Sequence, residues 1–183
     1  MARPKNFNRE GVLDKTIPVF WQQGFADTSL QDLEKATGVN KSGLYSEFED
    51  KEDLFIASLR HYLGALNAEE TMSRQPLGWH NVEQFLKYTY GCFGQKGCFS
   101  VNSMREYAVL PPEARVLMKD SLMTLRRLLL KNIKAEKSAM DPGVIADLVL
   151  TFFSGLCVEQ NLQPSKAHIT RKIGNFMQMI QKM

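Results

Sequence analysis

Four polar side chains lie close together in the sequence, at Lys41, Ser42, Tyr45 and Ser46. They supply one cation and three hydroxyl groups, all of which donate hydrogen bonds. If this stretch is a helix, Leu44 and Phe48, four positions apart, define its inner face and leave the four polar side chains outside. Such a face suits hydrogen bonding to phosphate oxygens or to the edges of nucleic-acid bases.

A second reactive candidate is Cys98, in the segment KGCFSVNSMREYA. It follows Gly97 at the predicted start of a helix, where the helix dipole stabilises a thiolate, and Lys96 is adjacent in sequence. A stabilised thiolate would react with electrophiles or oxidants, although a buried and unreactive cysteine fits the position as well. The other cysteines, Cys92 and Cys157, have apolar neighbours and are predicted to be structural.

The sequence offers no catalytic or metal-binding constellation, and no cofactor is implied. The three cysteines lack CxxC spacing, and the histidines His61, His80 and His168 are scattered. No nucleophile and base can be paired from motifs. An odd, sparse set of cysteines also argues against a disulfide framework and favours a reducing compartment.

Length and charge narrow the class further. The 183 residues suffice for one core with a small module in front of it. No apolar run of about 18 residues and no apolar signal core is recognised, which predicts a cytoplasmic protein. Residues 1–55 carry a formal charge of −3 and residues 56–183 carry +6, so a polycation that coats DNA is excluded. A front module that binds nucleic acid must rely on a few cations, at Arg3, Lys5, Lys41 and Lys51.

Helix signals dominate the chain. A first helix is predicted from Asn8, its N-cap, to Gln23, with a bend at Pro18. A second begins at a capping box formed by Thr28 and Gln31, buries Leu30, Leu33 and Ala36, and ends at Gly38. Asn40 caps a third helix, and a long helix over 51–66 follows.

Beyond a predicted loop over 70–80, five more helical segments are separated by Gly97 and by prolines. They cover residues 81–94, 98–109, 112–135, 142–162 and 165–182. No segment shows the alternation typical of strands. The chain is therefore predicted to be all-α, with a three-helix domain at 1–50, a larger helical domain at 51–183, and the 51–66 helix as the connection.

Two short helices joined by a tight, glycine-containing turn are the elements of a helix-turn-helix motif, whose second helix enters the major groove of DNA. Gly43, which has no side chain, would permit close approach of the backbone. Free amides at the helix starts near Thr28 and Asn40 would suit phosphate. The same stretch also fits a plain helical hairpin within a bundle.

The stretch TSLQDLEKATGVNKSGLYSEFEDKEDLF, with the preceding FWQQGF, resembles the DNA-binding domain of TetR-family transcriptional regulators over residues 8–56. The resemblance implies phosphate contacts for Thr28, Ser29, Tyr45 and Lys51. It places Lys41, Ser42, Gly43 and Ser46 in the major groove, and it makes Arg3 and Lys5 a basic arm. Pro18 departs from the uninterrupted first helix of the family.

The resemblance also implies a homodimer that reads a palindrome with half-sites about 34 Å apart, in which the last two helices pair with those of a second copy. The candidate interface residues are Leu148, Phe152, Gly155, Leu156, Ile173, Phe176, Met177 and Ile180. The same residues would also fit the core of a single chain.

A ligand pocket is expected between the central helices, with an aromatic and methionine-containing wall that suits an apolar or aromatic ligand. The candidate residues are Trp79, Phe85, Tyr88, Phe93, Met104, Tyr107, Leu122 and Phe153. Ordinary core packing explains each of them equally well.

The segment around Cys98 resembles a GCxxVNxxxE pattern found in a subset of TetR-like regulators, some of which sense electrophiles or oxidants through a cysteine. The sequence therefore predicts a repressor that binds double-stranded DNA and is released by a small molecule or by thiol modification. Two alternatives stay open: a helical enzyme that uses the pocket, and an adaptor that binds another protein through residues 81–183.

Overall fold

The computed structural model describes residues 7–88 and 97–183, and within these ranges every regular element is helical, as predicted. The front helices are α1 (Arg9–Gln23), α2 (Leu30–Thr37) and α3 (Lys41–Leu44). The remaining elements are α4 (Lys51–Ala65), α5 (Ala68–Met72), α6 (Trp79–Tyr88), α7 (Phe99–Ser103), the 3-10 helix η2 (Met104–Glu106), α8 (Pro112–Lys134), α9 (Pro142–Glu159), the 3-10 helix η3 (Gln160–Leu162) and α10 (Lys166–Ile180).

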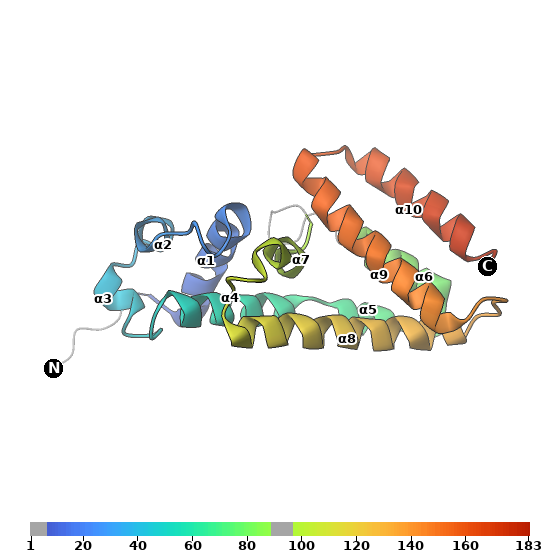
Figure 1. Cartoon of the computed structure of the whole chain (residues 1–183), viewed down its shortest axis with the longest axis horizontal. Helices are drawn as coiled ribbons and strands as arrows, with labels where there is room; N and C mark the ends of the chain where they lie inside the picture. Colours follow the sequence, from blue (N-terminus) through green and yellow to red (C-terminus); the bar gives the residue numbers. More distant parts are fainter. Residues whose placement is uncertain (1–6, 89–96) are drawn as a thin grey trace.

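The molecule is elongated, with α1 to α3 at one end and α9 and α10 at the other (Figure 1). The long helices α4 and α8 pack against each other and connect the two ends. Helix α7 lies between the ends and packs against α1, α4 and α9. The division at residue 50 remains a prediction, since α4 packs on both α1 and α8.

The front helices begin and end mostly as predicted. Asn8 caps α1, which continues through Pro18 as one helix and ends at Gly24. The predicted cap of α2 was wrong, because Ser29 and Asp32, rather than Thr28 and Gln31, form the capping box. The predicted buried face differs in two positions, since Leu30 is half-buried and Ala36 is exposed, whereas Thr37 is buried.

An aromatic cluster joins the front helices to the centre of the chain. Phe20 and Trp21 of α1 make edge-to-face contacts with Phe55 and Tyr62 of α4, at centroid distances of 5.1 and 5.3 Å. Phe99 at the start of α7 stacks on Trp21 at 5.8 Å and touches Tyr62 at 5.7 Å. Each such pair adds about 0.5–1.5 kcal/mol beyond its buried area, so α7 is held firmly against the front helices.

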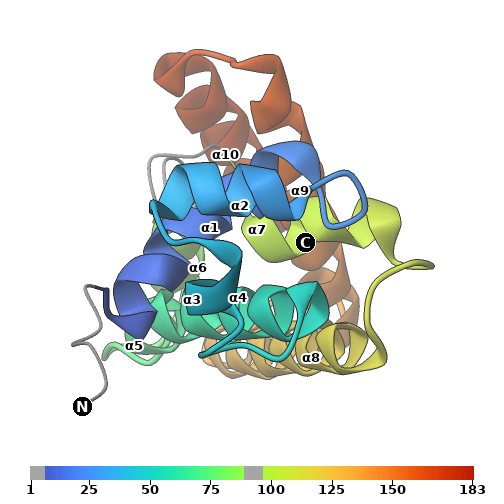
Figure 2. The same ribbon diagram turned by 90° about the vertical axis from the view of Figure 1, so that its left-hand side faces the viewer.

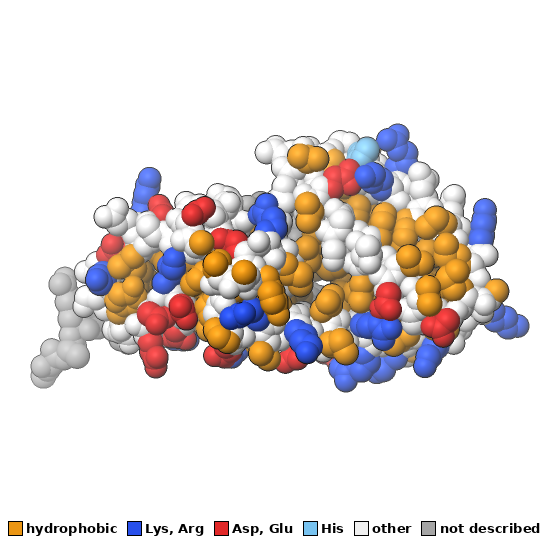
Figure 3. Space-filling model, viewed as in Figure 1, with side chains coloured by type: hydrophobic (Ala, Val, Ile, Leu, Met, Phe, Trp, Pro, Cys, Tyr) orange, Lys and Arg blue, Asp and Glu red, His pale blue; other side chains and the backbone are white. Residues whose placement is uncertain are grey.

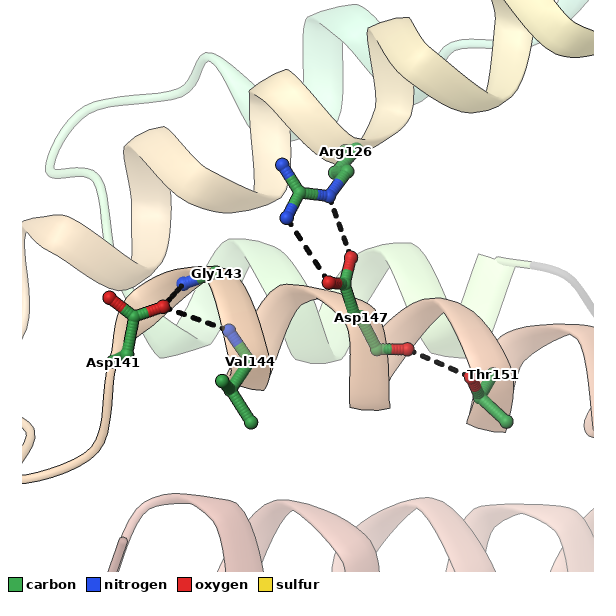
Figure 4. A network of polar contacts seen from close by, with 6 residues as sticks. All are labelled: Arg126, Asp141, Gly143, Val144, Asp147 and Thr151. Carbon is green, nitrogen blue, oxygen red and sulfur yellow. Dashed lines mark hydrogen bonds and ion pairs between the residues drawn. The ribbon is translucent and has the colours of Figure 1, made fainter.

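The start of α9 is anchored on α8 by an ion pair (Figure 4). Arg126 of α8 donates from Nε and Nη2 to the two carboxylate oxygens of Asp147, at 2.6 and 3.1 Å. This two-point contact lowers the pKa of Asp147 and raises that of Arg126. Asp141 caps α9 by accepting hydrogen bonds from the amides of Gly143 and Val144.

The predicted loop over 70–80 was too long at both ends, because α5 reaches Met72 and α6 begins at Trp79. The remaining turn is organised by Asn132 of α8, which is fully buried. Its amide group donates to the carbonyls of Met72 and Leu128 and its oxygen accepts from Gly78 and Asn81. A side chain that satisfies every one of its hydrogen bonds in this way fixes its surroundings.

Candidate functional site

The predicted reading face lies on α3 and the turn that follows it, at the free end of the molecule (Figure 2). Asn40 caps this helix, as predicted, by accepting the amide hydrogen of Gly43 at 2.9 Å. Backbone hydrogen bonds of helical type continue from Tyr45 to Phe48, so the helical path extends beyond the four residues of α3. Val39, Leu44 and Phe48 are buried beneath it, as predicted.

The outer face carries the four polar side chains as the sequence predicted. Lys41, Ser42, Tyr45 and Ser46 are all exposed, and 37% of the surface of Tyr45 is accessible. The Lys41 ammonium lies 5.8 Å from the centre of the Tyr45 ring, and the Ser46 hydroxyl donates to the Gly43 carbonyl at 2.7 Å. Contact of these four side chains with DNA stays a prediction.

Gly43 is needed for a different reason than the one predicted. It is half-buried, and a methyl group built on it would collide with Val39 and crowd Asn40 and Phe7. The bare face of this glycine is therefore turned toward the protein. The absence of a side chain lets α3 pack on its own turn, and close approach of DNA is not required to explain it.

Two side chains predicted to contact phosphate are hydrogen-bonded within the protein. Thr28 is 1% exposed, and its hydroxyl donates to the Gly24 carbonyl at 2.5 Å. Lys51 donates from Nζ to the carbonyls of Phe25, Ala26 and Thr28, at 2.9, 3.3 and 3.0 Å. Both side chains therefore build the loop between α1 and α2, and neither is available to phosphate in this structure.

The amides at the helix starts are also largely occupied. The Asp32 carboxylate accepts the amide and hydroxyl hydrogens of Ser29, at 3.0 and 2.5 Å, which lowers the pKa of Asp32. The amide of Lys41 donates to the carboxylate of Glu34. Acidic side chains therefore occupy the amides of Ser29 and Lys41, and phosphate binding at the two helix starts stays a prediction.

A cavity of about 520 Å³ lies among the helices α4 to α9, a volume typical of small-molecule sites. Of the predicted pocket residues, Phe85, Met104, Leu122 and Phe153 line it, together with further apolar residues of α4 and α8 such as Leu63, Leu125 and Leu128. The mostly apolar wall fits the predicted ligand class. Charged side chains at Arg60, Glu69 and Asp120 border it.

Three other predicted pocket residues lie elsewhere. Tyr88 and Tyr107 are 45% and 47% exposed, and Trp79, at the first position of α6, is also absent from the cavity wall. Helical spacing could not distinguish these residues from those that line the cavity, because aromatic residues occur on both the inner and the outer faces of the helices. Phe93 and Cys92 lie outside the described residues, as do Arg3 and Lys5.

Cys98 lines the cavity and is 7% exposed. Its sulfur accepts a hydrogen bond from the thiol of Cys157 and others from the Tyr62 hydroxyl and the amides of Val101 and Ser100. These donors, first among them Cys157, outweigh burial and lower the pKa of Cys98 to about 7. The prediction that Cys157 is only structural missed this contact, because no sequence motif relates the two cysteines.

Half of the predicted dimer interface belongs to the core of the single chain. Leu156, Ile173, Met177 and Ile180 are each at most 3% exposed, so they cannot form much of a contact with a second copy. Leu148 and Gly155 are exposed on the outer side of α9. Phe152 and Phe176 stack face to face at 3.8 Å and connect α9 with α10.

The outer side of α9 and α10 carries an apolar stripe that the sequence analysis did not separate from the core. Val144, Leu148, Val158, Leu162 and Met179 are 38–82% exposed, and hydrophobic side chains gather over these helices (Figure 3). Contrary to expectation, one window of the described residues, Pro142–Leu162, is long and apolar enough to span a membrane by length and composition, with 39% of it buried. A helix that is apolar on all sides is usually covered on all sides.

Glu106 is a functional candidate that sequence reasoning missed. Its carboxylate accepts the amide hydrogens of Phe25 and Ala26, at 2.6 and 3.0 Å. The segment that begins with Cys98 in the cavity wall therefore ends, at η2, on the loop between α1 and α2. No sequence signal marks an interaction across 80 positions.

The comparisons with known proteins agree with this architecture. Residues 12–58 match the family model described as bacterial regulatory proteins, tetR family. The HTH-type transcriptional repressor ComR of Escherichia coli (strain K12) is 36% identical over 109 residues, which are 56% of this chain and 52% of ComR. The chain thus spans about half the length of this relative.

Solved structures share the fold over nearly the whole chain. A cysteine-substituted variant of the TetR-family regulator CifR, solved with 26-base-pair operator DNA, has a TM-score of 0.80 and 22% identity, covering 96% of this chain and 98% of that one. The reduced form of Escherichia coli NemR has a TM-score of 0.77 and 18% identity, covering 94% and 96%. The relatives are transcriptional regulators and not enzymes. Residues 12–58 therefore match the DNA-binding domain of the tetR family of bacterial regulatory proteins, and the chain as a whole has the fold of TetR-family regulators.

Proposed function

We propose that the protein is a cytoplasmic, homodimeric repressor that binds a palindromic operator through α3 and the turn after it. The observation that carries this proposal is the exposed set Lys41, Ser42, Tyr45 and Ser46 on a capped helical stretch within the matched 12–58 segment. Hydroxyl groups and one lysine suit contacts to base edges and phosphates without a strong nonspecific electrostatic attraction to DNA. The names of ComR, a repressor, and of CifR, solved with operator DNA, support the same role.

The dimer is proposed on the outer side of α9 and α10. The exposed stripe includes Val144, Leu148 and Val158 of α9 and Leu162 of η3, and exposed Gly155 between them leaves space into which a second helix can pack. Burial against a second copy would remove this apolar surface from water. Two reading helices in fixed relation are also needed to recognise two half-sites of a palindrome.

Release from DNA is assigned to the cavity. A small apolar or aromatic molecule that binds the cavity in only one of two arrangements of the helices would shift the population toward that arrangement. Modification of Cys98, which lines the same cavity, would act on the same wall. Two proteins of similar fold, the cysteine-substituted CifR and the reduced form of NemR, support a role for this thiol.

The experiment compares DNA binding of matched variants on an operator obtained by selection from genomic fragments. Lys41→Ala and Tyr45→Phe should each weaken binding by about 1–3 kcal/mol, roughly five- to 150-fold, while the fold and assembly state stay unchanged. Lys119→Ala and Tyr107→Phe, exposed residues on α8 and after η2, serve as controls and should bind as the unaltered protein does. Unchanged affinity in both reading-face variants would refute the assignment.

A further inference from the structure

The second cysteine beside Cys98 gives the cavity wall a chemistry that a single thiol lacks. The Cys157 thiol is the polar neighbour that contributes most to lowering the pKa of Cys98. The backbones also approach closely, because a methyl group on Gly97 would collide with the Cys157 carbonyl, and the Gly97 amide donates to Oε1 of Gln160 at 3.1 Å. The start of α7 therefore lies directly on the last turn of α9, which places the two cysteines next to each other, as a disulfide requires.

The two cysteines differ in access to small molecules. Cys98 forms part of the cavity wall, whereas Cys157 is fully buried and does not line the cavity. A peroxide that enters the cavity therefore meets Cys98 first. The amides of Ser100 and Val101 and the hydroxyl of Tyr62 all donate to its sulfur and stabilise the reactive thiolate.

We propose that Cys98 and Cys157 form a regulatory disulfide within one chain when the protein meets hydrogen peroxide. The Cys98 thiolate attacks one peroxide oxygen, the O–O bond breaks, hydroxide leaves, and a sulfenic acid forms. The Cys157 thiol then attacks this sulfur, forms the S–S bond, and releases water. In total the two thiols lose two electrons and two protons, and one peroxide becomes two water molecules. The inference deepens the thiol branch of the proposed function and rests on it for the regulatory consequence.

The disulfide would act on the DNA-binding end through a short path. Cys98 precedes α7, and η2 follows α7 directly and ends at Glu106, which holds the amides of Phe25 and Ala26. The covalent bond draws the start of α7 toward α9, and Phe99, next to Cys98, is packed on Trp21 of α1. A shift of this segment therefore displaces the front helices relative to α9 and α10.

The test uses full-length reduced protein treated with equimolar hydrogen peroxide, followed by alkylation and peptide mapping without reductant. The expected result is one peptide pair joined through Cys98 and Cys157, on a chain that migrates as a monomer in denaturing gels. Cys157→Ala should yield sulfenic acid at Cys98 and no disulfide, and Cys92→Ala should still form the disulfide. A disulfide that involves Cys92, one between chains, or no disulfide at all would overturn the proposal.

A second measurement separates chemistry from regulation. Oxidation should weaken operator binding by about tenfold or more in the unaltered protein and in Cys92→Ala, with recovery after dithiothreitol. Circular dichroism of each variant before oxidation controls for folding, and Cys157→Ser provides a second variant if the alanine variant is unstable. If the disulfide forms and DNA affinity stays constant, its regulatory role is wrong. If the reduced protein binds no DNA, the proposed function fails, while peptide mapping still decides the disulfide.

Discussion

Glu106 and Lys51 hold opposite sides of the same loop. The Glu106 carboxylate accepts the amide hydrogens of Phe25 and Ala26, and the Lys51 ammonium donates to the carbonyl oxygens of the same two residues. One side chain comes from η2 and the other from the first turn of α4. The loop that leads from α1 into α2 is therefore held by η2 and α4. Both elements also line the cavity, through Met104 and Leu63.

Removal of the Glu106 carboxylate should destabilise this junction. Glu106→Ala leaves two amides without their acceptor, one of them partly buried, and an unsatisfied buried amide costs about 1–3 kcal/mol. Urea unfolding followed by circular dichroism should show a loss of this size. The control is Glu113→Ala, which removes an exposed ion pair with Arg60 and should cost at most about 1 kcal/mol. Equal stability of the two variants would show that the Glu106 contacts contribute nothing.

Lys51 should behave as a structural residue. Lys51→Met removes three hydrogen bonds to carbonyls and the contact of the ammonium with the Phe25 ring at 4.7 Å, so unfolding should require about 1–3 kcal/mol less free energy. DNA affinity should fall only as far as the fold is disturbed. If stability is unchanged while the salt dependence of DNA binding falls by about one unit, Lys51 contacts phosphate after all.

The fold followed from local signals, and the contacts at its centre did not. Asn8, Asn40, Gly24 and Gly38 marked helix ends correctly because caps depend on neighbours within a few positions. The partners of Lys51 are 23–26 positions away and that of Glu106 is about 80 away. Such pairs depend on how helices pack, and helical periodicity contains no information about them.

The same limit explains the predictions about the body. Period and composition identify an apolar residue, but they do not tell whether its neighbour belongs to the same chain or to another one. Ile173 and Leu148 both read as interface candidates, and only the packing of α9 on α8 and α10 on α6 buries the first and exposes the second. For the same reason, the sequence predicted both Phe85 and Tyr88 to line the pocket, although Phe85 lines it and Tyr88 is exposed.

A charge on the outer side of α9 should disrupt the proposed dimer. Leu148→Arg places a cation within the exposed apolar stripe, where burial against a second copy would leave it unpaired. Sedimentation equilibrium should give twice the chain mass for the unaltered protein and the mass of one chain for the variant. Val116→Arg on α8, a residue 56% exposed, should remain a dimer. A monomer in the control, or a dimer in Leu148→Arg, would contradict the assigned surface.

The reactivity of Cys98 should depend on pH in a way set by its neighbours. Its pKa is lowered to about 7, first by the Cys157 thiol and further by Tyr62, whereas an ordinary thiol has a pKa of about 8.5. The rate of alkylation by iodoacetamide should therefore rise about tenfold per pH unit below 7 and level off above it. Tyr62→Phe removes one donor and should move the midpoint to higher pH. A midpoint near 8.5 in the unaltered protein would show that Cys98 is not activated.

The most direct measurement of the central claim is selection of bound genomic fragments by the purified, reduced protein, followed by a shift assay on the enriched sequence at several salt concentrations. We expect an inverted repeat with half-sites about one helical turn or more apart, bound with a steep salt slope and lost in Lys41→Ala. If the folded, reduced and ligand-free protein enriches no sequence, it is not an operator-binding regulator.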